Sequence, residues 1–356
     1  MNRWANDLVA WFTAHGRDLP WRKSRDPYAV WISEIMLQQT RIETVVGYFG
    51  RWMAAFPTVT ALNQAPLDEV LAHSAGLGYY SRARNLHGSA RMIVEQHGGQ
   101  FPRDLTALLA LPGIGRYTAG AIASIAFGQP TSIVDGNVAR VLQRLYAIPG
   151  TVQDRVVNAE LWKLAAQLVP AGAASRFNQG LMELGQVVCT VSDPDCAHCP
   201  LSKPCQARKQ RRQHELPAPR KKRAVPVVRI TTVVVQDRRG MLLMRRKPRG
   251  LWGGLWEPPC FEVTTRSSPL KATAELCRAL GVTAGNQAPI RFEHLLTHRR
   301  VRFSVYRAVA GRKATPHHRL PQYDGAKWVQ PSDLGNLGVA AWTTRLLTAL
   351  CKETDV

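Results

Sequence analysis

Two carboxylic acids stand in surroundings that could give them opposite charge states. Glu34 lies in the apolar segment 29–40, where Val30 and Leu37 share its face if the segment is helical. Such neighbours exclude water and raise the pKa of a carboxyl group, so Glu34 could hold a proton near neutral pH and donate it. A structural hydrogen bond or salt bridge is the alternative for a glutamate among apolar residues.

Asp135 is the second acid, and it directly follows the short apolar run of residues 132–134. An ionised carboxylate held beside a cleft can stabilise an oxocarbenium-like sugar cation, so the two acids together would suit the breaking of a glycosidic bond. The alternative is that Asp135 is a helix N-cap. Asn137 could be that cap instead, or could orient Asp135 or a water molecule.

Four of the seven cysteines lie close together, as Cys189, Cys196, Cys199 and Cys205, with the spacing C-x6-C-x2-C-x5-C. Four thiolates at this spacing can converge on one metal centre. An iron–sulfur cluster and a four-cysteine zinc site both fit the spacing, and buried unligated thiols are a third interpretation.

A turn that could hold a phosphate lies between two segments with helical patterning, residues 104–110 and 117–127. Gly113 and Gly115 on either side of Ile114 allow a tight turn and leave backbone amides to face an anion. The positive end of the following helix dipole would favour that anion, and Ile114 would be buried. An ordinary turn between helices with a glycine cap is the alternative.

The charge of the chain points to a polyanionic partner. Its 47 Lys and Arg against 25 Asp and Glu leave a net charge of +22. No apolar run reaches the ~18 residues that a membrane span needs, and residues 1–7 lack the apolar stretch of a secretory signal. We therefore expect a soluble cytosolic protein with no membrane partner, in which the cysteine cluster binds metal rather than forming disulfides.

The elements that must position these residues fall into two parts, as 356 residues suggest at ~150 residues per domain. Residues 1–205 are expected to form an all-α domain, 206–224 a basic linker, and 225–356 an α+β domain that opens with a β-hairpin. Helical spacing occurs in residues 4–14, 29–49, 67–72, 271–280 and 341–351, and strand patterning in 225–236, 241–246 and 301–308.

Several of these motifs resemble one family of DNA repair enzymes. The Leu-Pro-Gly-Ile-Gly sequence at 111–115 and the cysteine spacing are similar to those of the iron–sulfur helix-hairpin-helix DNA glycosylases, the endonuclease III and MutY group. Residues 31–40 (WISEIMLQQT) and 76–86 (GLGYYSRARNL) resemble signatures of MutY-type adenine DNA glycosylases, which excise adenine mispaired with 8-oxoguanine. The resemblance implies a helix-hairpin-helix domain with a [4Fe–4S] cluster at 189–205, followed by a Nudix-like domain.

The resemblance also implies a role for each matching residue. Glu34 would protonate adenine at N7, and Asp135 would lie beside the sugar cation. The other implied site residues are Tyr117 and Asn137 in the catalytic pocket, Arg22 and Gln179 at the flipped adenine, Gln39, Thr40, Leu77 and Tyr79 around 8-oxoguanine, and Gly113 and Gly115 at a DNA phosphate.

Tyr117 distinguishes between branches of the resembled family. Endonuclease III-type relatives have a lysine at this position, whose amine attacks C1′ and leads to strand cleavage through a Schiff base. A phenol cannot form that imine, so a monofunctional glycosylase is expected. The alternatives are an endonuclease III-like glycosylase and lyase acting on oxidised pyrimidines, and a non-catalytic iron–sulfur DNA-binding protein.

The C-terminal part resembles a Nudix fold without its hydrolase residues. Arg278 and Ala279 stand where a Nudix hydrolase has the paired glutamates that hold Mg²⁺, so recognition is the expected role. In MutY relatives a Phe-Ser-His loop of this domain reads 8-oxoguanine, and Leu296-Thr297-His298 matches it except for the leucine. The resemblance implies a monomer that binds duplex DNA with 8-oxoguanine:adenine or guanine:adenine mispairs, in a bacterial-type cytoplasm at the nucleoid.

Overall fold

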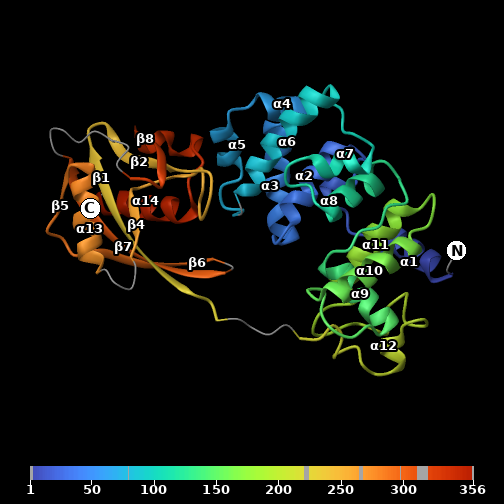
Figure 1. The fold of residues 1–356 in the computed structure, drawn as a ribbon. Coiled ribbons are helices and arrows are strands. Elements are labelled where there is room, and N and C mark those ends of the chain that lie inside the picture. The colour runs from blue at the N-terminus through green and yellow to red at the C-terminus, as the bar shows by residue number, and fades with distance from the viewer. Residues whose placement is uncertain are drawn as a thin grey trace. The chain divides into compact units, whose positions relative to one another are not determined.

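The structure is a computed structural model that describes residues 3–78, 80–219, 224–263, 268–296, 298–310 and 320–354 (Figure 1). The chain divides into two compact units, and each is described by itself. The helical unit is formed by Met1–Gln64 and Asn85–Lys222, and the sheet unit by Ala65–Arg84 and Arg223–Val356. No helix within the described ranges is both long and apolar enough to cross a membrane.

The helical unit contains no strand among its described residues, in agreement with the predicted all-α domain. Its helices are α1 (Arg3–His15), η1 (Pro20–Arg22), α2 (Pro27–Leu37), α3 (Ile42–Ala55), α4 (Val59–Gln64), most of α6 (Ser81–His97), α7 (Leu105–Ala110), α8 (Arg116–Ala121), η2 (Ile122–Ala126), α9 (Gly136–Tyr146), α10 (Arg155–Leu168), α11 (Ala174–Val187) and α12 (Gln206–Lys209).

Helix α2 lies at the centre of this unit. Asp26 caps its first turn by accepting hydrogen bonds from the Tyr28 and Ala29 amides, and Pro27 occupies the first helical position. Every residue from 28 to 36 is buried, because α2 packs against α3, α8 and η2. Glu34 therefore lies on a helix that is enclosed on all sides.

The helix-hairpin-helix turn joins α7 to α8. Gly113 has a φ of 75°, and a Cβ atom built on it would lie 2.6 Å from the Asn85 side-chain nitrogen, so only glycine fits. Ile114 is buried, as the sequence predicts. The helical segment predicted over residues 117–127 is formed by α8 and, directly after it, the short π-helix η2.

Helices α9 and α11 approach each other closely where the predicted site residues begin. A Cβ atom on Gly185 of α11 would lie 2.7 Å from the Asn137 Cβ on α9, so the absence of a side chain at 185 permits this contact. α11 also packs along α1. The start of α9 is thus fixed against the middle of the bundle.

The sheet unit is a mixed α+β structure, again as predicted. Its elements are α5 (Leu67–His73), β1 (Val227–Asp237), β2 (Gly240–Arg246), β3 (Trp256–Glu257), β4 (Cys260–Glu262), α13 (Pro269–Leu280), β5 (Val282–Ala284), β6 (Ile290–Leu296), β7 (Arg299–Ala310), β8 (Tyr323–Val329), η3 (Pro331–Asn336) and α14 (Ala341–Thr354). β1 pairs in parallel with β7, and the other pairings between these strands are antiparallel.

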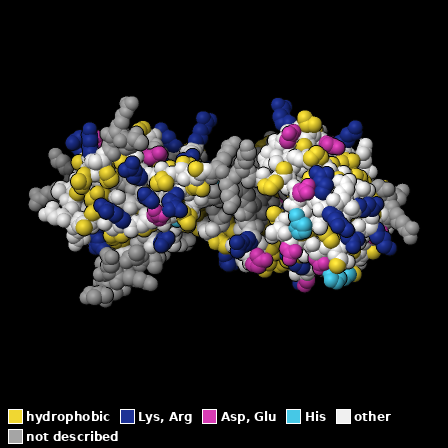
Figure 2. All heavy atoms as spheres, turned by 90° about the horizontal axis from the view of Figure 1, so that it is seen from below, with side chains coloured by type: hydrophobic (Ala, Val, Ile, Leu, Met, Phe, Trp, Pro, Cys, Tyr) yellow, Lys and Arg dark blue, Asp and Glu magenta, His cyan; other side chains and the backbone are white. Residues whose placement is uncertain are grey.

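Two helices cover opposite faces of this sheet. Thr231 of β1 contacts Thr273 of α13, with 2.7 Å between the hydroxyl oxygens. Ser304 of β7 pairs with Thr231, so the preceding residue, Phe303, points to the opposite face of the sheet. There Phe303 stacks on Trp342 of α14, with ring centroids 4.4 Å apart. In Figure 2 this unit, on the left, shows more Lys and Arg than acidic side chains on the face turned to the viewer.

The observed units differ from the predicted division in two places. Residues 65–84 belong to the sheet unit, because Leu71 packs against Gly338 and the Tyr80 hydroxyl donates to the Val339 carbonyl at 3.3 Å. α12 lies in the expected linker, yet Ala207 is fully buried and the helix packs against α9. The many basic residues of this segment led to its prediction as a linker, although Ala207 is small and apolar enough to pack against α9.

Candidate active site

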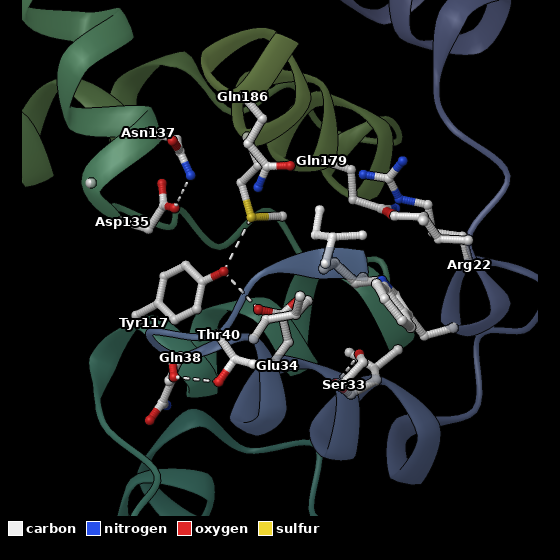
Figure 3. Close-up of a pocket in the computed structure, with 18 of the residues that line it drawn as sticks. Arg22, Ser33, Glu34, Gln38, Thr40, Tyr117, Asp135, Asn137, Gln179 and Gln186 are labelled. Carbon is white, nitrogen blue, oxygen red and sulfur yellow. Dashed lines mark hydrogen bonds between the residues drawn. The ribbon is translucent and has the colours of Figure 1, made fainter. Parts of the chain in front are cut away.

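A cavity of about 490 Å³ in the helical unit gathers eight of the predicted site residues (Figure 3). Its walls are α2 with the residues after it, η1, α8, the start of α9 and one face of α11. The eight residues are Arg22, Glu34, Gln39, Thr40, Tyr117, Asp135, Asn137 and Gln179. Residues up to 157 positions apart in the sequence, from 22 to 179, thus meet in one cleft.

Glu34 forms part of the cavity wall with only 5% of its surface exposed. Burial raises the pKa of its carboxyl group to about 7, and the negative charge of Asp135 acts in the same direction. The Tyr117 hydroxyl and the Arg22 charge oppose this rise. Glu34 is therefore protonated in a large fraction of molecules at neutral pH and can act as a proton donor.

Tyr117 connects Glu34 to α11. Its hydroxyl donates to Glu34 Oε2 over 2.6 Å and also lies 3.1 Å from Met182 Sδ (Figure 3). A phenol has a single hydrogen, so when Glu34 carries a proton the tyrosine can turn its hydrogen towards the sulfur and accept from Glu34 instead. The residue can thus follow the protonation state of the acid without moving.

Asp135 is the N-cap of α9 and also lines the cavity. Its Oδ1 accepts from the Val138 amide at 2.7 Å, and Oδ2 accepts from Asn137 Nδ2 at 2.9 Å. The N-cap interpretation therefore applies to Asp135 itself, and Asn137 orients its carboxylate. Burial raises the pKa of Asp135, whereas these two hydrogen bonds favour its charged form.

Arg140 joins this carboxylate to the cysteine segment. Its Nη2 donates to Asn137 Oδ1 at 2.9 Å, and its Nε donates to the Cys189 carbonyl at 2.8 Å. Asp135 is the N-cap of α9, and Asn137 and Arg140 lie in its first turns. The position of the first cysteine is thus coupled by hydrogen bonds to the wall of the cavity.

The four predicted ligands, Cys189, Cys196, Cys199 and Cys205, line one small cavity beside α9. Burial raises the pKa values of the last three thiols, and the negative charges of neighbouring cysteines act in the same direction. Within the described part of the chain, however, no three His, Cys, Asp or Glu side chains are arranged to hold one metal ion. The chemistry of four thiolates suits either a zinc ion or an iron–sulfur cluster.

Arg144 is a buried cation next to these thiols, with 2% of its surface exposed. Its Nη1 lies 3.3 Å from Cys189 Sγ and donates to the Thr190 carbonyl at 2.6 Å, while its Nε donates to the Leu216 carbonyl at 2.8 Å. A buried guanidinium beside four thiols suits an anionic centre. The donor set therefore fits an iron–sulfur cluster held by four thiolates.

Three residues of α11 at the site were not singled out from the sequence. Met182 and Gln186 line the cavity, and Glu183 lies fully buried behind it, where it accepts from Arg17 Nε at 2.6 Å and from Arg22 Nη2 at 2.8 Å. These residues follow Gln179 at intervals of three, four and seven, which is the spacing of one helix face. That spacing could have identified them once Gln179 was chosen.

The remaining predicted DNA contacts lie elsewhere. Gly113 and Gly115 are in the hairpin turn, and Leu77 is a half-buried residue of the sheet unit whose carbonyl accepts from Arg82 at 3.2 Å. His298 is exposed at the turn between β6 and β7. Tyr79 and Thr297 lie outside the described residues.

Comparisons with known proteins cover most of the chain. Residues 32–167 match the HhH-GPD superfamily of base excision DNA repair proteins, and residues 231–349 match the NUDIX domain. Adenine DNA glycosylase of Homo sapiens is 37% identical over 393 aligned positions, which cover 94% of this chain and 71% of the human protein. The adenine DNA glycosylase of Schizosaccharomyces pombe is 31% identical, with 95% and 87% covered.

Two solved structures resemble the helical part. A thermostable thymine-DNA glycosylase is 32% identical with a TM-score of 0.53, over 58% of this chain and 95% of that one. Endonuclease III in a non-covalent DNA complex is 28% identical with a TM-score of 0.50, over 58% and 94%. The predicted helix-hairpin-helix domain followed by a Nudix-like domain is confirmed.

Proposed function

This chain belongs to the adenine DNA glycosylase family, within the HhH-GPD superfamily, and on that premise we propose that it hydrolyses the N-glycosidic bond of adenine mispaired with 8-oxoguanine or guanine in duplex DNA. The observation that carries the proposal is that Glu34 and Asp135 line one cavity and differ in their partners. Glu34 is buried beside a single hydroxyl, while Asp135 accepts two hydrogen bonds that favour its charge.

The proposed reaction begins with an adenine flipped out of the duplex into the cavity. Glu34 transfers its proton to N7 of adenine, and the electrons of the C1′–N9 bond leave with the base. Asp135 stabilises the positive charge that develops on the sugar. Water then adds to C1′, and the proton it loses restores the acid form of Glu34, so that adenine and an abasic site are the products.

The edge of adenine would be recognised by amide and cationic groups on the opposite wall. Gln179 offers one donor and one acceptor, which suits the paired donor and acceptor of adenine. Arg22 is held in place by Glu183 and lines the same cavity. Gln39 and Thr40, which follow α2 at the cavity rim, would contact the orphaned 8-oxoguanine together with Leu77, Tyr79, Thr297 and His298.

The four cysteines would hold a [4Fe–4S] cluster. A cluster ligated by four thiolates supplies no open coordination site, so its contribution would be to fix the 189–205 loop. Arg144 and Arg140 connect this loop to α9, and through Asn137 to Asp135. The cluster thus has a structural link to the catalytic wall.

The proposal is tested with purified protein and four duplexes that differ only in the base opposite adenine: 8-oxoguanine, guanine, cytosine or thymine. Alkali converts each abasic product into a strand break that a gel resolves. We expect adenine loss opposite 8-oxoguanine and guanine and none opposite the other two. Equal loss from all four duplexes, or loss from none, would contradict the proposed specificity or the glycosylase itself.

Adding borohydride to the same experiment distinguishes a monofunctional glycosylase from the glycosylase and lyase alternative. Because Tyr117 has no amine, the protein is expected to form no covalent adduct with abasic DNA when borohydride is present. Strong covalent capture would instead favour the endonuclease III-like glycosylase and lyase.

The pH dependence of the rate follows from the two acids. Glu34 must carry a proton, and its pKa of about 7 means that the single-turnover rate should fall about tenfold per pH unit above that value. Asp135 must be charged, so the rate should also fall on the acid side, at a pH above the ordinary aspartate value of 3.8 because the pKa of Asp135 is raised. The expected profile is bell-shaped.

Tyr117→Phe provides the check on this assignment. The Tyr117 hydroxyl lowers the pKa of Glu34, so its removal should move the alkaline limb to higher pH. The position of the limb is measured from single-turnover rates between pH 5 and pH 9, roughly two units either side of neutrality. If the rate fell at the same alkaline pH in the wild type and in Tyr117→Phe, a group other than Glu34 would be responsible for that fall.

A further inference from the structure

One face of the sheet unit carries arginines from three adjacent strands. Arg229 lies on β1, Arg291 on β6, and Arg300 and Arg302 on β7. The strand register places these side chains on the same face, which we call the arginine face. Its three rows across the strands are Glu293–Arg302–Arg229, Leu295–Arg300–Val227 and Arg291–Ser304–Thr231.

The arginine face has an excess of positive charge. Glu293 is the only acid in these rows, and its carboxylate lies 2.6 Å from Arg302 Nε and 3.5 Å from Arg300 Nη1. The side chains of Arg229 and Arg291 form no hydrogen bond or ion pair with the residues that the structure describes. Four arginines against one glutamate leave a charge of +3, and all five of these residues are exposed.

A hollow of about 310 Å³ lies within this face. Arg229, Arg291 and Arg302 line it together with Glu293, Phe292 and Ser304. Guanidinium groups present planar sets of donors that match the oxygens of a phosphate, and they lose little solvation on binding one. Unpaired like charges this close repel each other, so binding of an anion would relieve the repulsion.

The same hairpin supplies the reason to choose DNA as the anion. β6 and β7 are joined at the turn that contains His298, which the proposed function places at the damaged strand. A strand rises ~3.3 Å per residue, so Arg300 and Arg302 stand within about 7 and 13 Å of that turn. A duplex engaged by the turn would carry its phosphates past this row of arginines.

We propose that the arginine face binds backbone phosphates of duplex DNA and adds affinity that does not depend on the mispair. The choice of DNA rests on the proposed function, whereas the anion site rests on the arginines themselves. Arg229 and Arg291 are the key residues, because neither is engaged by Glu293.

The test compares the double variant Arg229→Gln/Arg291→Gln with the control Arg155→Gln/Arg278→Gln. The control removes the same charge from two exposed arginines on α10 and α13 that line neither the catalytic cavity nor the hollow of the arginine face. Fluorescence anisotropy gives Kd for an undamaged duplex and for the same duplex with an adenine:8-oxoguanine pair, across a range of salt concentrations. Thermal unfolding of both variants verifies that they are folded.

For the double variant we expect the slope of log Kd against log salt to fall by about 1.8, which corresponds to two phosphate contacts at ~0.9 each. Kd at fixed low salt should rise roughly tenfold, by the same factor for both duplexes. The control should keep the wild-type slope. An unchanged slope in the double variant, or an equal decrease in the control, would overturn the proposal.

A second experiment tests whether the arginine face binds an anionic lipid surface instead of DNA. Sedimentation with phosphatidylserine-containing vesicles should give the same bound fraction for wild type and the double variant. Loss of vesicle binding with a wild-type DNA slope would overturn the assignment to DNA. Failure of the proposed function would instead appear as intact adenine in every duplex, with the difference in salt slope still present.

Discussion

Replacing Glu34 with glutamine is expected to lower the single-turnover rate of adenine release by about 10²–10⁴-fold. Glutamine has the same shape and can still accept the hydrogen bond from Tyr117, but it has no proton to transfer at neutral pH. Binding of the mispaired duplex should be retained, since the variant leaves the rest of the cavity intact. Rates are measured with enzyme in excess over labelled duplex, so that product release does not limit them.

Glu160→Gln is the matched control for this variant. Glu160 is exposed on α10 and does not line the cavity, and its substitution should leave the rate unchanged. The raised pKa of Glu34 also makes a stability prediction: the folded state loses stability as pH rises from about 4.5 through about 7, and Glu34→Gln should abolish that loss. A rate for Glu34→Gln within tenfold of wild type would remove Glu34 from the proposed mechanism.

Asp135→Asn is expected to lower the same rate by about 10²–10³-fold, the size of effect seen when one preorganised charge-stabilising group is removed. Asparagine is as good an N-cap as aspartate, so the hydrogen bond from the Val138 amide can persist. The change therefore removes the charge that faces the sugar cation and spares the start of α9. Single-turnover kinetics on the adenine:8-oxoguanine duplex measure the effect.

Asp104→Asn makes the corresponding control. Asp104 caps α7 by accepting from the Ala107 amide at 2.8 Å, and it does not line the cavity. Both variants should keep the wild-type unfolding temperature, and only Asp135→Asn should be slow. If the two variants lose activity equally, the effect of Asp135 would be on folding rather than on the cation.

The parts of the site that the sequence predicts are those encoded locally. Glu34 stands among apolar neighbours on a helix that begins at an Asp-Pro cap, and these features are visible in a short stretch of sequence. The break of an apolar run at Asp135 likewise marks a helix start. What the residues could not decide was the choice between N-cap and catalytic acid, and the structure shows that the cap also lines the cavity.

The parts that escaped prediction depend on distant packing. Glu183 is a buried acid whose charge is neutralised by Arg17 and Arg22, which lie near the start of the chain. No residue close to Glu183 in the sequence indicates this pairing. The assignment of Leu71 and its neighbours to the sheet unit depends on close contact with Gly338, which lies far along the chain. Neither contact can be predicted from the residues that are close in the sequence.

The resemblance contributed most where local chemistry is least specific. Four cysteines alone leave zinc and iron–sulfur open, and in the structure the four line one cavity beside Arg144. The choice of a [4Fe–4S] cluster comes from the resemblance. Leu77 and His298 belong to the sheet unit, whereas all the residues that line the cavity belong to the helical unit. Their contribution to lesion recognition stays a prediction.

The most direct measurement is the release of free adenine, quantified by mass spectrometry after one turnover on a duplex with adenine opposite 8-oxoguanine. The wild-type protein should release one adenine per abasic site formed, and the double variant Glu34→Gln/Asp135→Asn should release none above the spontaneous background. Adenine release by the double variant at the wild-type rate would contradict the two-acid mechanism, as would a folded wild-type protein that binds this duplex and leaves its adenine in place.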